Sequence, residues 1–155
     1  MSVYVVRHAK AGSRHDWVGD DSERPLTKAG RKQSDEIARQ LAAEPITGVW
    51  SSPATRCVQT VEPLARAHGL DVIREPRLAE GAPFEDVLAL LGEVPDGAVL
   101  CSHGDVIPDL LHALVRRGTR VLTPPDWRKG TVWTLDPPGV DGAVATARAD
   151  PPPAR

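Results

Sequence analysis

Two histidines in this sequence, His8 and His103, each follow a short apolar run rich in β-branched residues. Such runs are typical of buried strands in a parallel sheet. Ligands bind at the carboxyl ends of strands in these sheets, so we expect both histidines at one edge. Arg7 precedes the first histidine, and Arg56 follows a third expected strand. Two imidazoles and two guanidiniums would then converge on a site for an anion, with phosphate the obvious candidate.

These residue types suit phosphoryl transfer, which needs positioning and stabilisation of charge on the phosphate oxygens. Arg7 and Arg56 can donate bidentate, charge-assisted hydrogen bonds to those oxygens. A neutral His8 can act as the nucleophile if a hydrogen bond at one ring nitrogen fixes its tautomer. A protonated His103 would add positive charge beside the transferring group.

The bulk properties predict one globular domain and exclude several classes of protein. The chain has 155 residues, 41% of them apolar, and a net charge of −2, which argues against a nucleic-acid polymer as partner. No apolar run approaches the roughly 18 residues of a membrane span, and the first expected strand leaves no room for a signal peptide. Cys57 and Cys101 lie outside any metal-ligand spacing and are expected to be reduced core thiols. We therefore expect a cytoplasmic protein that needs neither metal nor cofactor and does not bind membranes.

Expected strands and helices alternate along the chain. After the first strand, strands are expected at 48–52, 71–74, 97–102, 131–135 and 143–148, and helices at 28–43, 53–68, 84–91 and 106–117. Asp105 is expected to cap the last helix, Pro63 to kink or split the second, and Gly30 to let the first approach the catalytic loop. The alternation predicts an α/β fold, a single three-layer α/β/α domain over residues 1–149 with a mostly parallel sheet. A proline-rich, disordered tail is expected at 150–155.

Four motifs, in order, resemble those of the histidine phosphatase superfamily, which is phosphoglycerate mutase-like. They are Arg7-His8, the helix start LTKAGRKQ at 26–33, the segment SSPATRCVQT at 51–60, and Ser102-His103-Gly104. The resemblance covers nearly the whole chain and implies that family's fold. It also implies a phosphate pocket of Arg7, His8, Arg56 and His103, with a phosphohistidine formed on His8.

The same resemblance implies that Glu80 protonates the leaving group, a role that needs partial burial or a nearby phosphate. The alternative is a solvated loop glutamate. The short segment between Arg56 and His103 is similar to that of the small bacterial phosphohistidine phosphatases. Three segments, Gly19-Asp20-Asp21, Arg24-Pro25-Leu26 and Arg128-Lys129-Gly130, resemble the histidine-phosphatase domain of actinobacterial Nudix fusion proteins. This likeness implies nucleotide phosphates as substrates.

Five further residues are candidates for binding the rest of the substrate. Lys10, Arg14 and Lys129 would add positive charge around the pocket, which suits a ligand with more than one phosphate. Trp17 would lie against a base, and Gly104 belongs to the motif of the second histidine. Ordinary surface charge, or a loop anchor in the case of the tryptophan, is the alternative for these side chains.

The sequence thus predicts a metal-independent phosphatase that acts on a phosphomonoester, a nucleotide phosphate or a phosphohistidine protein. The alternatives are a catalytically silent module that binds a phosphorylated ligand and a phosphoglycerate mutase-like phosphotransferase. A metal site at His8, His103 and Asp105 is a third alternative. It is disfavoured because Arg7 beside the first ligand would repel a divalent cation.

Overall fold

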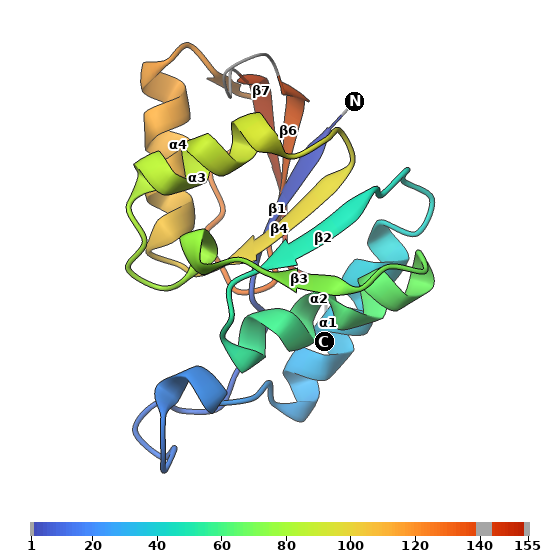
Figure 1. The fold of residues 1–155 in the computed structure, drawn as a ribbon, viewed down its shortest axis with the longest axis vertical. Coiled ribbons are helices and arrows are strands. Elements are labelled where there is room, and N and C mark those ends of the chain that lie inside the picture. Colours follow the sequence, from blue (N-terminus) through green and yellow to red (C-terminus); the bar gives the residue numbers. More distant parts are fainter. Residues whose placement is uncertain (1, 139–143, 154–155) are drawn as a thin grey trace.

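A mostly parallel sheet forms the centre of the computed structural model, which describes residues 2–138 and 144–153. Its strands are β1 (Val3–Arg7), β2 (Gly48–Ser51), β3 (Val72–Arg74), β4 (Ala98–Ser102), β5 (Arg120–Val121), β6 (Val132–Pro138) and β7 (Val144–Asp150). They follow the spatial order β3-β2-β4-β1-β6-β7-β5 (Figure 1). The apolar sequence of β1 and β4 matches their position, because both strands have neighbours on each side and helices on each face.

The register of the parallel strands explains how the two histidines come together. β1 pairs in parallel with β4, and Arg7 lies opposite Ser102. The residues that follow, His8 and His103, therefore leave the sheet at the same edge, as predicted. β2 and β3 continue the parallel half of the sheet. On the other side, β6 runs antiparallel to β1 and β7 antiparallel to β6.

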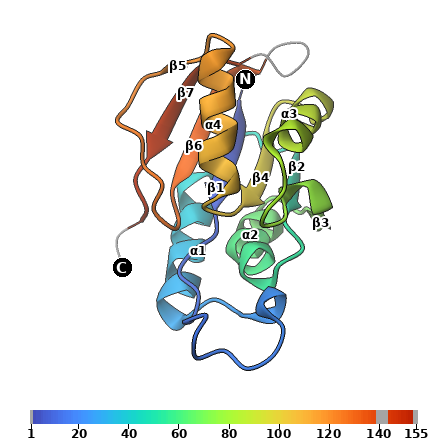
Figure 2. The same cartoon turned by 90° about the vertical axis from the view of Figure 1, so that its left-hand side faces the viewer.

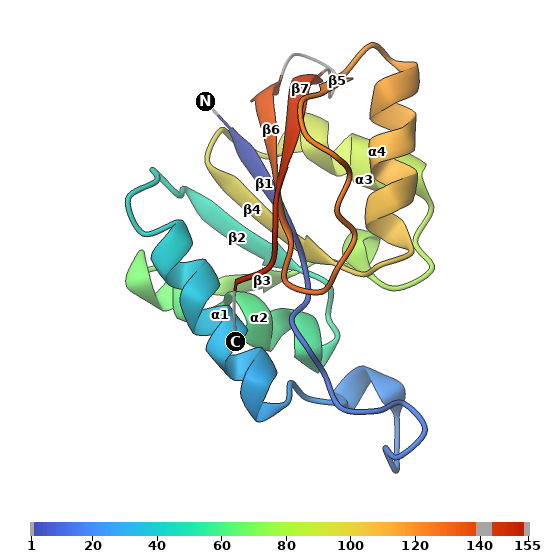
Figure 3. The same cartoon turned by 180° about the vertical axis from the view of Figure 1, so that it is seen from behind.

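Two pairs of helices enclose the sheet. The helices are α1 (Lys28–Gln40), α2 (Thr55–Ala67), α3 (Phe84–Glu93) and α4 (Val106–Arg116), with short 3-10 helices η1 (Asp21–Glu23) and η2 (Pro76–Leu78). α1 and α2 cover one face, and α3 and α4 cover the other (Figures 2 and 3). Alternate residues of β1 supply both cores: Val3 and Val5 face α3 and α4, whereas Tyr4 and Val6 face α1 and α2. The predicted three-layer α/β/α fold is confirmed.

The start of α1 packs directly on the loop that follows His8. A Cβ atom on Gly30 would lie 1.9 Å from the carbonyl oxygen of Lys10, so only glycine allows this approach. The Gln33 side chain accepts from the Lys10 amide at 2.9 Å, and the Thr27 amide donates to the Lys10 carbonyl at 3.0 Å. The predicted role of Gly30 is confirmed, and the contact anchors the loop beside β1.

Three details differ from expectation. α1 ends at Gln40 rather than at 43, and Pro63 does not split α2, which is continuous because buried residues on either side of Pro63 pack against the sheet. Asp150 belongs to β7 rather than to a tail, since it pairs with Val132 of β6. Position 143, the expected start of that strand, and positions 154–155 lie outside the described residues.

Candidate active site

His8 lies at the base of a cavity of about 630 Å³ at the carboxyl ends of β1 and β4. The residue is 6% exposed, and Nδ1 lies 2.8 Å from the carbonyl oxygen of Ala9. A carbonyl oxygen only accepts hydrogen bonds, so Nδ1 carries the proton and Nε2 keeps its lone pair. Burial lowers the pKa of His8 to about 3, and the neighbouring cationic groups act in the same direction. The ring is therefore neutral at physiological pH, with one nitrogen available as a nucleophile.

His103 lies beside His8, with the ring centroids 5.5 Å apart and the rings edge to face. Its Nε2 lies 2.8 Å from the hydroxyl oxygen of Ser52 and 3.5 Å from the sulfur of Cys57. The other ring nitrogen, Nδ1, is buried and has no hydrogen-bond partner among the described residues. It lies 3.9 Å from Glu80 Oε1. Ser52 and Cys57 thus hold the His103 ring at Nε2, and Nδ1 is close to the Glu80 carboxylate.

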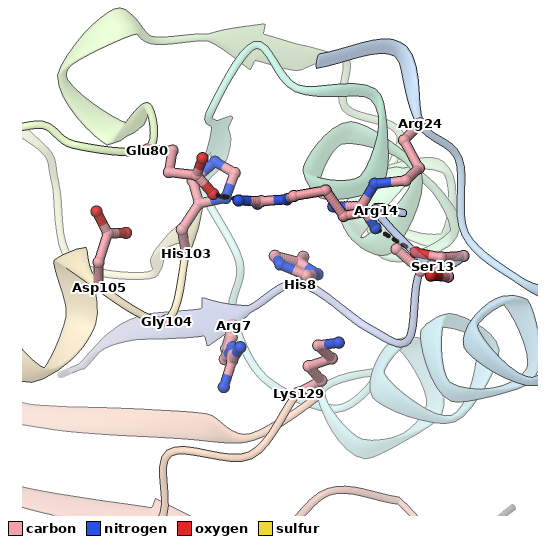
Figure 4. Close-up of a pocket in the computed structure, with 12 residues that line it drawn as sticks. Arg7, His8, Ser13, Arg14, Arg24, Glu80, His103, Gly104, Asp105 and Lys129 are labelled. Carbon is pink, nitrogen blue, oxygen red and sulfur yellow. Dashed lines mark hydrogen bonds and ion pairs between the residues drawn. The ribbon is translucent and has the colours of Figure 1, made fainter. Parts of the chain in front are cut away.

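Arg7 extends from the end of β1 into the pocket wall beneath Gly104 (Figure 4). Its Nη1 donates to the carbonyl oxygen of Trp127, and its buried Nε has no partner in the described part of the chain. A Cβ atom on Gly104 would lie 2.5 Å from the guanidinium carbon. Glycine at this position therefore leaves the space that the guanidinium occupies.

Arg56, in the first turn of α2, is held beneath two carboxylates. Its side chain is 2% exposed, and its Nη2 lies 3.3 Å from both Asp21 Oδ2 and Glu80 Oε1. Nη1 donates to the backbone carbonyl of Asp21 at 2.9 Å. Because these groups cover it, Arg56 is not among the residues that line the cavity. A phosphate that bonds to Arg56 would share it with these carboxylates or displace them.

Glu80 reaches the cavity from the loop after η2, and its side chain is 45% exposed, so both its role as an acid and the alternative of a solvated glutamate stay open. Its Oε1 accepts from Arg14 Nη2 at 3.0 Å (Figure 4). The loop is tied down by Asp105, whose Oδ2 accepts from the Gly81 amide at 2.8 Å. Asp105 makes no side-chain hydrogen bond to the helix it precedes, so the prediction that it caps α4 is wrong. Its carboxylate bonds instead to the amide of the loop that carries Glu80.

A ring of cationic side chains surrounds His8. Figure 4 shows Arg7 and Lys129 on one side of the imidazole and Arg14 and Arg24 toward the other. Desolvation lowers the pKa of Lys129, and nearby Arg7 adds to this effect. Arg24, Ser13 and Asp21 were not identified as site residues from the sequence. They lie on the loop between β1 and α1, whose path no local pattern predicts.

Two of the expected substrate-binding residues lie outside this cavity. Lys10 is exposed and does not line it, because the Lys10 backbone is bound to the start of α1. Trp17 lies on the same loop, where its Nε1 donates to the carbonyl of Asp20 at 2.9 Å. The indole lines a separate, smaller pocket of about 210 Å³. Neither residue therefore lines the main phosphate cavity, and their contact with the rest of the substrate stays a prediction.

The ligand set required by the metal-site alternative does not assemble. Among residues 2–138 and 144–153, no group of three or more His, Cys, Asp or Glu side chains is arranged to hold a metal ion. Cys57 and Cys101 are both buried, and they do not form a disulfide with each other. A membrane-crossing helix is also missing from the described part of the chain, where no helix is long and apolar enough.

The fold and the paired histidines at its edge define the class: this is the histidine phosphatase fold. The model of the histidine phosphatase superfamily (branch 1) matches residues 3–86. The chain therefore belongs to the histidine phosphatase superfamily, and the resemblance seen in its four motifs is confirmed. The second histidine, His103, lies beyond the matched range but on the neighbouring strand.

Individual relatives agree with this assignment. The chain is 37% identical over 141 residues to an 8-oxo-(d)GTP phosphatase of Mycolicibacterium smegmatis, a match that covers 86% of this chain and 44% of the relative. It thus spans less than half of that protein. The structure of the protein histidine phosphatase SixA complexed with tungstate superposes with a TM-score of 0.77 at 25% identity, over 94% of this chain and 93% of SixA. A mycobacterial glucosyl-3-phosphoglycerate phosphatase shares the fold, with a TM-score of 0.68 at 19% identity over 96% of each chain.

Proposed function

We propose that this protein is a phosphatase that passes the phosphoryl group of a small phosphorylated substrate first to His8 and then to water. The observation that carries the proposal is the state of the His8 ring. Its Nδ1–H is held by the Ala9 carbonyl, and its neutral Nε2 faces a cavity surrounded by cationic groups. A nucleophile that stays neutral in a positively charged pocket matches the requirements of phosphoryl transfer.

In the first step, the lone pair on His8 Nε2 forms a bond to phosphorus while the bond from phosphorus to the leaving oxygen breaks. The leaving oxygen takes a proton from Glu80 in its protonated form. In the second step, a water oxygen attacks the phosphohistidine, the N–P bond breaks, and Glu80 takes the proton from that water. The two steps release one phosphate and the protonated leaving group, an alcohol from a phosphomonoester or a nucleoside phosphate from a nucleotide, and they return His8 and Glu80 to their starting states.

Arg7, Arg56 and His103 can stabilise the negative charge that develops on the phosphate oxygens during the transfer. Arg7 has a buried Nε without a partner among the described residues, and Arg56 is fixed by Asp21 and Glu80. Both guanidiniums can donate to the phosphate oxygens as negative charge spreads over them. His103 has a free Nδ1 near Glu80 and would donate from it when protonated.

The substrate class proposed is a phosphomonoester or a nucleotide phosphate, ahead of a phosphohistidine protein. Arg14, Arg24 and Lys129 extend the positive charge beyond the space that a single phosphate at His8 would fill. Such an extension suits a ligand with several phosphates. The relatives are named for both kinds of substrate, one an 8-oxo-(d)GTP phosphatase and the other a protein histidine phosphatase.

Trapping of the intermediate tests this proposal. The protein is mixed with a labelled phosphomonoester and quenched in alkali, where phosphohistidine survives. Wild type and His68→Asn should carry the label, whereas His8→Asn should not. His68 is a suitable control because its ring bonds to the Leu41 carbonyl, outside the cavity. Turnover of para-nitrophenyl phosphate by His8→Asn at the wild-type rate would overturn the proposal. A complete lack of turnover by the wild type would favour the silent binding module.

A further inference from the structure

The small pocket beside Trp17 adjoins the phosphate cavity. Three residues, Gly12, Ser13 and Arg24, line both spaces, so the two pockets are neighbours along this segment. The small pocket has a volume of about 210 Å³. Sites for drug-sized ligands occupy roughly 300–1,000 Å³, so this pocket suits one ring system rather than a whole ligand.

The walls of the small pocket are fixed and largely apolar. The Trp17 indole is anchored through its Nε1 to the Asp20 carbonyl and is 36% exposed. Leu26 is 5% exposed and is held through its amide by the side chain of Gln59 and through the bridge to Ala11. A flat apolar surface that is already ordered costs little entropy when a ring binds to it.

Arg24 lies where the two spaces meet. Its side chain is 6% exposed, its Nε lies 3.0 Å from Asp21 Oδ1, and its Nη1 donates to the Gly12 carbonyl. The guanidinium is therefore fixed at the junction. Asp21 also lies near Arg14 and Arg56, so its negative charge is compensated by three guanidiniums. An anionic group that crosses the junction would meet a positive field.

We propose that the Trp17 pocket binds the base of a nucleoside diphosphate or triphosphate whose terminal phosphate reaches His8. The base stacks on the indole, and the inner phosphate or the sugar passes Arg24. This inference rests on the proposed function and specifies its substrate class. The arrangement also accounts for the separation of the tryptophan from the phosphate cavity, since a base and a terminal phosphate are at opposite ends of the ligand.

Two substrates that share a diphosphate test the inference. GDP and inorganic pyrophosphate both present a terminal phosphate, but only GDP carries a base. Trp17→Ala should lower kcat/KM for GDP about tenfold or more, in line with the loss of base–aromatic stacking, and should change kcat/KM for pyrophosphate by less than about threefold. Trp17→Phe, which keeps an aromatic face, should retain most of the GDP activity. Val18→Ala, at the adjacent residue that is 90% exposed, should match the wild type.

Three outcomes would overturn the inference. One is an equal loss on both substrates in Trp17→Ala, which would assign the indole to holding the loop. Another is no loss on GDP. The third is a wild-type preference of more than about tenfold for a phosphohistidine peptide over GDP. If the wild type turns over no phosphate ester at all, the proposed function fails separately. Calorimetric binding of GDP to the wild type and to Trp17→Ala then decides whether the pocket holds a nucleotide: a Kd unchanged by the substitution would overturn the inference.

Discussion

Replacement of Gly104 by alanine should displace the Arg7 guanidinium by direct contact. The added Cβ would lie 2.5 Å from the guanidinium carbon of Arg7 and 2.7 Å from its Nη2, whereas ordinary van der Waals contact begins near 3.4 Å. The guanidinium must therefore retreat by about 1 Å, the difference between these distances. Because Nη1 is bound to the Trp127 carbonyl, the retreat also strains or breaks that hydrogen bond.

The size of the effect follows from this displacement. A misplacement of about 1 Å in a group that positions the reaction can cost roughly 10²-fold in rate. We expect a loss of that order in kcat/KM for para-nitrophenyl phosphate. The stability loss should lie near the lower end of the range of about 1–3 kcal/mol for overpacking, since the group that moves is the end of a side chain.

A double-mutant cycle identifies the route of the effect. If Gly104→Ala acts through Arg7, the pair Arg7→Ala/Gly104→Ala should be no less active than Arg7→Ala alone. Urea unfolding of each variant shows whether the fold survives. A Gly104→Ala protein with kcat/KM within about threefold of the wild type would refute the reasoning. Additive losses in the double variant would refute the route through Arg7.

Three other predictions concern the same pocket. Arg56→Ala should lower kcat by about 10²- to 10³-fold, measured with para-nitrophenyl phosphate, and a loss under tenfold would contradict its role. Glu80→Gln should slow alkyl phosphates more than aryl phosphates, because an alkoxide needs a proton to leave; equal slowing would indicate a structural role. Burial lowers the pKa of His8 to about 3, so below pH 6.5 the unfolded chain binds a proton that the folded protein does not. From pH 7 to pH 5 the free energy of unfolding should therefore fall by about 2 kcal/mol more in the wild type than in His8→Asn, as measured by urea titration; an equal fall would contradict the low pKa.

The elements that the sequence predicts best are those with the strongest local patterns. β1 and β4 are continuous apolar runs because both faces of each strand are covered by helices. Their parallel pairing is enough to bring His8 and His103 together, so the centre of the candidate site could be predicted without knowledge of any side-chain position.

The periphery of the site could not be predicted in the same way. Lys10 is placed by long-range contacts of the loop after β1, which is anchored to Gly30 and Gln33 of α1, whereas Trp17 bonds to Asp20 within that loop. Asp105 illustrates the same limit. Its position before a helix favours a capping role, but the Gly81 amide, 24 residues earlier in the chain, is its hydrogen-bond partner. The hydrogen-bond partner of such a side chain depends on which distant loop lies next to it in the folded protein.

The central position of β1 in the sheet affects how the chain folds during its synthesis. The strand that ends just before His8 needs β4 on one side and β6 on the other, and these neighbours follow it by some 90 and 125 residues. At translation rates of about 5–20 residues per second, β1 waits several seconds at least for its first partner to be synthesised. Its apolar faces are exposed throughout this interval, and pairings between distant strands also form slowly. A nascent or truncated chain that holds β1 but lacks β4 would therefore be prone to aggregation.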